Sequence, residues 1–369
     1  MHRTGVVLSL SLVCVAAQAQ PCVTPQALGS YNTPDYSRGV AIEGSRAYVA
    51  DTSAGLYVID IANPSSPALL GTFEMATEAI GVDAAGDVVY VADNLAGLRI
   101  VDVSDPTSPT LLFTYDTAGT ATGVTVVGNL AYVADGFAGL QIIDVTHPAA
   151  PVHLGGFDTQ GRAVSVAVSN GVAYVADDFK GLQIIDVSDP DNTTLLGSFE
   201  TLFYSLDVKV VGSTAYVADF SQGIWAIDVS DPANPAMLDF IDFPQRLEAV
   251  AIDGSLAYIA HGLAGLTVVD ISDPSALAPI ATLGTPGVAK DIVHVNGMAY
   301  IADGSSGLQI IRAEPCAPDT NCDGMLSPAD FSAWVSAFST ASPACDQNND
   351  GLCTPADFSA WVANYNMGC

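Results

Sequence analysis

Two stretches near the C-terminus place oxygen-bearing side chains at the spacing that a calcium ion requires. Each is a twelve-residue loop with Asp first, Asn at position 3, Asp at position 5, Gly at position 6 and Asp last. Side-chain oxygens at positions 1, 3, 5 and 12, a carbonyl at 7 and a ligand at 9 make up a calcium site, and Gly provides the sharp turn. The predicted ligands are Asp319, Asn321, Asp323, Met325, Ser327 and Asp330 in the first loop, and Asp346, Asn348, Asp350, Leu352, Thr354 and Asp357 in the second. The sequence therefore predicts two calcium ions; the alternative is a pair of Asx-rich turns without metal.

A short helix is expected after each loop. Apolar side chains recur there at the i, i+3, i+4, i+7 spacing of an amphipathic helix. They are Phe331, Trp334, Val335 and Phe338, and then Phe358, Trp361, Val362 and Tyr365. Ser327 and Thr354 could also cap these helices, with Pro328 and Pro355 at the first helical position.

Most of the remaining chain is a repeat with a period of 42 residues. A Tyr recurs at this interval without insertion, and a Gly follows it seven residues later in every copy. The seven tyrosines are Tyr48, Tyr90, Tyr132, Tyr174, Tyr216, Tyr258 and Tyr300. Each unit contains four short apolar runs bounded by Gly, Asn, Asp or Pro, which are strand signals. Repeated four-stranded units of this length predict a β-propeller.

The two ends of the repeat predict how the ring closes. Residues 25–31 match the fourth strand of a unit, whereas the last unit stops after its third strand at Ile311. These fragments complete one blade between them, which leaves no open sheet edge. We therefore predict an all-β, seven-bladed propeller over residues 20–313 and a small α-helical module with paired calcium loops over residues 314–369.

One face of the predicted disc carries the loops in which the copies differ most. Loops on a rigid scaffold often carry function, and Arg and aromatic side chains are enriched at recognition sites. The candidate ligand face consists of Tyr36, Arg38, Arg162, Tyr204, Arg246, His261 and Lys290. Variable loops can also be merely unconstrained, so both interpretations stay open here.

A column of acids follows the tyrosines on the same face. Its members are Asp51, Asp93, Asp135, Asp177, Asp219 and Asp303, with His261 in the sixth copy. We interpret these acids as acceptors of backbone N–H groups in a tight turn, because a binding site seldom recurs in every blade. A ring that binds cations is the alternative.

Composition and the N-terminus restrict the class of partner. Ten Lys and Arg stand against 40 Asp and Glu, for a formal net charge of −30, so nucleic acid is not expected as a partner. Residues 5–16 are apolar and precede Ala17-Gln18-Ala19, which predicts a signal peptide over residues 1–19. No other stretch predicts a transmembrane segment. We expect the protein to be exported, to the cell surface or the extracellular medium.

Cysteine positions suit an exported chain. Cys22 and Cys316 differ by 294 residues, which is seven periods of 42, and so they occupy the same column of the repeat. We predict a Cys22–Cys316 disulfide that locks the ring. The alternative pairs Cys316 with Cys369.

The strand motif, seen as LRIVD at Leu98–Asp102, resembles the LVIVD-repeat family of exported propellers over residues 25–312. The copies depart from it at Ile224–Asp228 and at Arg312. This resemblance implies a propeller fold, and a role in surface recognition or adhesion.

The paired loops resemble a dockerin, and the closing Met-Gly-Cys369 is similar to Gly-Cys-ending modules of exported bacterial proteins. A dockerin implies docking to a cohesin-type or cell-envelope receptor. Positions 10 and 11, where dockerins usually carry a hydroxyl pair, are Pro328-Ala329 and Pro355-Ala356, which argues against a cohesin but not against calcium.

Together these features predict an exported binding or scaffold protein whose propeller recognises an extracellular protein or glycan. The rivals are a polysaccharide-degrading propeller enzyme held in an assembly by its dockerin, and a structural surface-layer component. The sequence contains no G-x-S-x-G, H-E-x-x-H or phosphate-loop motif, so an enzyme is the less favoured of these classes.

Overall fold

A computed structural model describes residues 23–75, 77–315, 328–340 and 354–367. The chain divides into two compact units. One spans Val23–Glu314, and the other contains the C-terminal helices.

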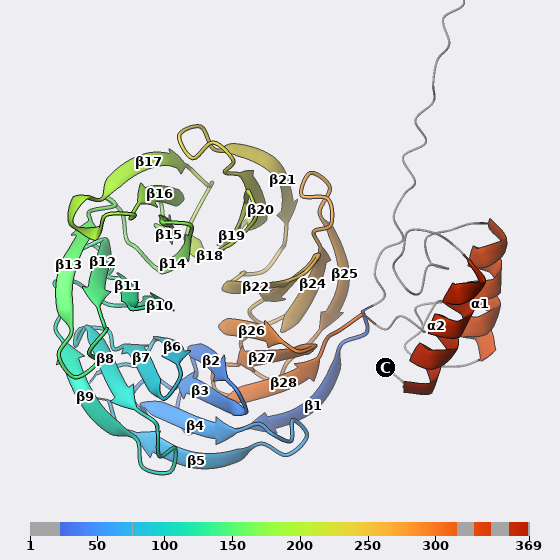
Figure 1. The fold of residues 1–369 in the computed structure, drawn as a ribbon, viewed down its shortest axis with the longest axis horizontal. Helices are drawn as coiled ribbons and strands as arrows, with labels where there is room; N and C mark the ends of the chain where they lie inside the picture. The colour runs from blue at the N-terminus through green and yellow to red at the C-terminus, as the bar shows by residue number, and fades with distance from the viewer. Residues whose placement is uncertain (1–22, 76, 316–327, 341–353, 368–369) are drawn as a thin grey trace, which may run out of the picture. The chain divides into compact units, whose positions relative to one another are not determined.

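The described part of Val23–Glu314 is a ring of seven antiparallel sheets of four strands each (Figure 1). Within every sheet the strands follow chain order from the inner edge outward, except in the last. The first three blades are β2 (Gly39–Glu43), β3 (Arg46–Ala50), β4 (Leu56–Asp60), β5 (Ala68–Phe73); β6 (Gly81–Ala85), β7 (Val88–Ala92), β8 (Leu98–Asp102), β9 (Thr110–Tyr115); and β10 (Gly123–Val127), β11 (Leu130–Ala134), β12 (Leu140–Asp144), β13 (Val152–Phe157).

The next three blades have the same order, with a short 3-10 helix, η1 (Pro190–Asn192), before the outer strand of the fourth. They are β14 (Ser165–Ser169), β15 (Val172–Ala176), β16 (Leu182–Asp186), β17 (Thr194–Phe199); β18 (Ser205–Val211), β19 (Thr214–Asp219), β20 (Gly223–Asp228), β21 (Ala236–Asp242); and β22 (Ala249–Asp253), β23 (Leu256–Ala260), β24 (Leu266–Asp270), β25 (Ala278–Leu283).

The seventh blade joins the two ends of the propeller. It contains β26 (Asp291–Val295), β27 (Met298–Ala302) and β28 (Leu308–Arg312), and its outer strand is β1 (Gln26–Tyr31) from the start of the repeat. β1 pairs antiparallel with β28, from Gln26 opposite Arg312 to Tyr31 opposite Leu308. The seven-bladed fold and the shared closing blade are therefore confirmed. Cys22 and Cys316 lie outside the described residues, so their disulfide stays a prediction.

The core lies between the blades. Seven clusters of buried apolar residues are found in the described propeller, one at each interface between neighbouring blades. The cluster between the second and third blades, for example, joins Tyr90, Leu98 and Ile100 to Val124 and Ala131. Each fully buried Leu, Ile or Val contributes roughly 1.5–3 kcal/mol, so these interfaces supply most of the stability of the ring. They also explain why the repeat length is constant.

The C-terminal unit contains the two expected helices, α1 (Pro328–Thr340) and α2 (Pro355–Met367). Trp334 and Trp361 are buried between them, with their ring centroids 6.4 Å apart. Neither of these helices, and no other helix in the described residues, is long and apolar enough to cross a membrane.

Gly29 in β1 is expected to be essential for ring closure. A Cβ atom there would lie 2.3 Å from the carbonyl oxygen of Pro64 in the adjacent blade. Gly29→Val should therefore push the two blades apart and lower the free energy of unfolding by about 1–3 kcal/mol. Urea denaturation measures this change. Ser30→Val, at an exposed position of the same strand, is the control; equal stability of the two variants would contradict the argument.

Candidate functional site

The column of acids holds the blades together. All six carboxylates are buried, with no exposed surface. In four blades a Thr eighteen residues earlier donates its hydroxyl to the acid at 2.6 Å. These pairs are Thr33–Asp51, Thr117–Asp135, Thr159–Asp177 and Thr285–Asp303. The predicted backbone N–H donors are also present, at Asp35, Gly119, Phe203 and Gly287. These donors and the Thr hydroxyls come from the segment that links one blade to the next, whereas the sequence had suggested the turn itself. Within the described residues the turn contributes only the Ser221 N–H, which is donated to Asp219. Each Thr–Asp pair therefore ties a connecting segment to the turn that it crosses.

His261 is the variant of this column, and the structure buries it beside the segment that carries Arg246. Its side chain is 5% exposed, and Nδ1 lies 2.9 Å from the Thr267 hydroxyl. Phe243 occupies the position of the donor Thr, and its ring packs edge-on to His261 at 5.0 Å. Burial lowers the pKa of His261. An aromatic pair thus replaces the Thr–Asp pair in the sixth blade, and His261 does not line the channel described next.

A channel of about 930 Å³ runs between the inner strands, and all seven blades contribute to its lining. Five of the candidate residues lie along it: Arg38, Arg162, Tyr204, Arg246 and Lys290. Tyr36 lines a smaller adjoining hollow, together with Arg38 and Lys290. The structure therefore brings together six of the seven residues that the sequence singled out on this face.

Ion pairs and ring contacts connect the side chains at the channel mouth. Glu248 Oε1 lies 2.6 Å from Lys290 Nζ and 3.4 Å from Arg246 Nε. The guanidinium carbon of Arg246 lies 3.8 Å from the centre of the Phe220 ring, which is a cation–π distance. Tyr204 contacts the Phe220 ring edge-on at 5.7 Å. The contacts form a continuous band from the seventh blade to the fifth.

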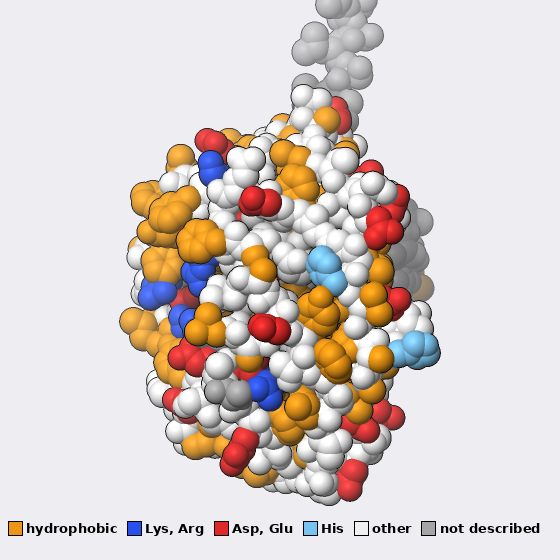
Figure 2. Space-filling view, turned by 90° about the vertical axis from the view of Figure 1, so that its left-hand side faces the viewer, with side chains coloured by type: hydrophobic (Ala, Val, Ile, Leu, Met, Phe, Trp, Pro, Cys, Tyr) orange, Lys and Arg blue, Asp and Glu red, His pale blue; other side chains and the backbone are white. Residues whose placement is uncertain are grey.

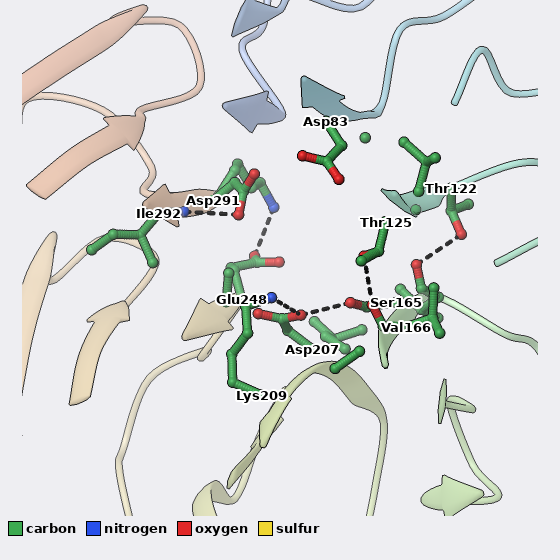
Figure 3. A pocket seen from close by; sticks show the side chains of 18 of the residues that line it. Asp83, Thr122, Thr125, Ser165, Val166, Asp207, Lys209, Glu248, Asp291 and Ile292 are labelled. Atoms are coloured by element: carbon green, nitrogen blue, oxygen red, sulfur yellow. Dashed lines mark hydrogen bonds and ion pairs between the residues drawn. The ribbon is translucent and has the colours of Figure 1, made fainter. Parts of the chain in front are cut away.

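Deeper in the channel, inner strands carry a second group of charges (Figure 3). Asp207 Oδ1 lies 3.3 Å from Lys209 Nζ and accepts a hydrogen bond from the Ser165 hydroxyl at 2.6 Å. Asp291 and Asp83 accept backbone N–H groups of the neighbouring blades at 2.9 and 2.7 Å. Three carboxylates and one ammonium group thus form an acidic layer below the basic mouth.

Burial and mutual repulsion shape the titration of this layer. Burial raises the pKa of Asp291 to about 6; the backbone N–H of Val40 opposes this and the Asp207 carboxylate adds to it. Burial alone would lower the pKa of Lys209, but Asp207, Asp291 and Asp83 together raise it. Lys209 is therefore charged at neutral pH.

Sequence reasoning did not identify this acidic layer. Its signal is a charge in a repeat column that is otherwise small and uncharged. The column of Asp207 and Asp291 reads Gly39, Gly81, Gly123, Ser165, Asp207, Ala249 and Asp291, and that of Lys209 reads Ala41, Asp83, Thr125, Ala167, Lys209, Ala251 and Val293. Comparison of these columns would have found both.

Three of the twelve predicted calcium ligands are described. Asp330 and Asp357 lie in the first turns of α1 and α2, and both are fully buried. Thr354 caps α2: its hydroxyl accepts the N–H of Ala356, and its own N–H is donated to Asp357 Oδ2 at 2.6 Å. The other nine lie outside the described residues, namely Asp319, Asn321, Asp323, Met325, Ser327, Asp346, Asn348, Asp350 and Leu352.

The fold and the lined central channel define a seven-bladed β-propeller, and a repeat protein of this architecture fits a binding or scaffold role. The model of the LVIVD repeat matches residues 34–75, 76–117, 118–159, 160–201, 204–241, 247–283 and 286–311. The chain belongs to the LVIVD-repeat family.

Solved structures share the propeller architecture at low sequence identity. U3-55K matches with a TM-score of 0.65 and 9% identity, over 80% of this chain and 99% of that one. BamB from Moraxella catarrhalis matches at 0.53 and 15%, over 80% and 92%. The computationally designed Ika8 protein matches at 0.58 and 9%, over 77% and 99%. These likenesses show the fold alone. No curated protein matches the chain.

The raised pKa of Asp291 predicts a pH-dependent stability. Between about pH 4 and pH 6 the folded protein keeps a proton that an unfolded Asp, with a pKa near 3.9, has released. Stability should therefore fall as the pH rises through this window. In Asp291→Asn, whose amide oxygen can still accept the Val40 N–H, the fall should be smaller by roughly 1–3 kcal/mol.

Urea denaturation at a series of pH values tests this prediction. Asp105→Asn is the control. Hydrogen bonds from Thr107 lower the pKa of Asp105, so any effect of this residue on the pH dependence of stability falls below the window between about pH 4 and pH 6. Parallel stability curves for the wild type and Asp291→Asn would show that Asp291 does not titrate as described.

Proposed function

We propose that this protein is an exported binding protein. Its propeller recognises an anionic extracellular protein or glycan at the channel mouth, and its C-terminal module binds two calcium ions and anchors the chain to a cell-envelope or cohesin-like receptor. The observation that carries the proposal is the concentration of positive charge. Of the ten Lys and Arg in a sequence of net charge −30, four stand at this mouth, and a fifth, Lys209, lies deeper in the channel.

The physical reason is that the rest of the molecule repels anions. A basic mouth in an acidic protein focuses the field, and so attracts an anionic group to that place alone. The aromatic rings beside the cations add contact area at little cost in conformational entropy. The acidic layer below limits how deep an anion can go.

The acidic composition of the C-terminal segment supports a calcium module. Residues 314–369 contain seven Asp and Glu and no Lys, Arg or His. Six of these seven acids are Asp at predicted ligand positions, and Asp330 and Asp357 stand last in their loops. A cation with oxygen ligands fits this donor set. When bound, calcium would supply positive charge at both loops.

The same module has apolar surface that suits anchoring. Phe331, Val335, Phe338, Phe358 and Val362 are each between 36% and 44% exposed. A receptor that covers this surface would gain hydrophobic contact area. Export, which the sequence predicts from residues 1–19, would place the protein where calcium is abundant.

Loss of the aromatic and cationic mouth should abolish ligand retention. The triple variant Arg162→Gln, Tyr204→Ala, Arg246→Gln is incubated with the exported proteins and glycans of the host, and bound material is compared with that of the wild type. We expect the bound material to fall to background with little change in melting temperature, because all three side chains are at least partly exposed. Unchanged retention would rule out this face.

Calcium binding is tested on the full chain by isothermal titration calorimetry. We expect two ions per chain, and one after Asp357→Ala, because the variant removes the final ligand of one loop. Ser332→Ala, at an exposed position of α1, should retain both. A wild-type protein that takes up no calcium would show that the loops are metal-free turns.

A further inference from the structure

The channel mouth carries a second feature besides charge, which is exposed apolar surface on the neighbouring loops. Phe179 and Leu202 are each 65% exposed and Phe203 is 44% exposed. Phe179 packs against Tyr204 of the mouth at 4.2 Å, so the apolar surface and the basic mouth are continuous. Figure 2 views the propeller from the side and shows hydrophobic and basic side chains gathered together on one face of the disc, at the left of the picture.

Exposed apolar side chains also occupy the equivalent turn position in the two preceding blades, and Leu263 occupies it in the sixth. Leu95 is 66% exposed and Phe137 is 79% exposed, and both stand two residues after the acid column, as Phe179 does. Large apolar side chains at one turn position of three consecutive blades form an exposed apolar arc, which we define as Leu95, Phe137, Phe179, Leu202 and Phe203. Exposed apolar surface of this kind marks an interaction site.

Two cations of the mouth are available to a partner. Glu248 already neutralises Lys290 and approaches Arg246. Arg38 and Arg162, by contrast, are exposed, and neither forms an ion pair within 4.0 Å in the described residues, although the Asp178 carboxylate lies near enough to Arg162 to be stabilised by it. They belong to the connections that lead into the first and fourth of seven blades, and so flank the channel from nearly opposite sides. Free guanidinium groups bind carboxylates in a bidentate manner.

We infer that the channel mouth and the apolar arc together bind an acidic peptide segment of a protein partner, one that carries Leu or Phe side chains beside its Asp or Glu residues. The inference rests on the proposed function and specifies the partner. Charge complementarity selects the acidic character. The arc favours a peptide over a polysaccharide, because its Leu and Phe side chains offer no polar group to bind sugar hydroxyls, whereas apolar peptide side chains can cover all five of them.

The acidic layer determines how such a peptide would lie. Asp83, Asp207 and Asp291 repel carboxylates from the depth of the channel, and Lys209 offsets only part of their charge. The peptide carboxylates therefore stay at the level of Arg38 and Arg162, and the apolar side chains lie outward on the arc. We therefore expect two contributions to the affinity. The contribution of the arginines weakens as salt is added, whereas the contribution of the apolar arc does not depend on salt.

Fluorescence anisotropy with the full-length protein tests the inference. The probes are short labelled peptides rich in Glu with Leu and Phe, peptides with Glu and Gly only, peptides with Lys in place of Glu, and an oligogalacturonate. We expect the first to bind most tightly. The double variant Arg38→Gln, Arg162→Gln should weaken it by about tenfold or more and reduce the salt dependence, in line with the weight of close charge pairs at interfaces.

Two further variants separate the contributions. Arg46→Gln, at the first residue of β3 and outside the channel lining, removes a charge without touching the site and should leave affinity unchanged. Leu202→Ser with Phe203→Ser should weaken the Leu- and Phe-bearing peptide and leave the Glu–Gly peptide unaffected. A melting curve for each variant verifies that the propeller is folded.

Each result has a defined meaning. Binding of the oligogalacturonate but not of any acidic peptide, lost in the double arginine variant, would overturn the peptide inference and retain the proposed function. Binding of neither would count against both. Equal loss in Arg46→Gln and in the double variant would mean nonspecific attraction and would also overturn the inference.

Discussion

Face-to-face packing of neighbouring blades is the interaction on which the rest of the structure depends. Every blade buries apolar residues against the blade on each side, so the ring exists only if the last blade meets the first with the same geometry. A constant repeat of 42 residues meets this condition, because each interface then has equivalent repeat positions at the same height. The blade shared by β1 and β28 completes it.

The rigid ring also explains why function can concentrate at the channel mouth. Thr–Asp pairs tie the connecting segments to the turns, as Thr159 and Asp177 do, and so hold the loops in which the mouth residues stand. Pairs of one kind recur where structure is required, whereas Arg38, Arg162 and Arg246 stand at positions that vary between copies. The recurring Thr–Asp pairs therefore support the loops of the mouth, whereas the arginines at the varying positions give the mouth its charge.

The sequence predicted the architecture well because each structurally required residue recurs in up to seven copies of the repeat. Blade number, ring closure and most of the mouth residues followed from that periodicity. Two features were missed for definite reasons. The donors to the acid column lie eighteen residues earlier, across a connection that only the folded ring brings near. The acidic layer consists of residues that most copies of the repeat lack, Asp207 and Lys209 among them. A consensus of the copies would therefore not contain them.

The pairing of β1 with β28 has a consequence for the order of folding. Six blades consist of strands adjacent in the sequence, so their contacts are local and can form early. The seventh requires Gln26 to meet Arg312, which is the least local strand pairing in the described propeller. Loop-closure entropy opposes such a contact until the rest of the chain is compact. The ring should therefore pass through an open, six-bladed arc, and its closure should be the slow kinetic step.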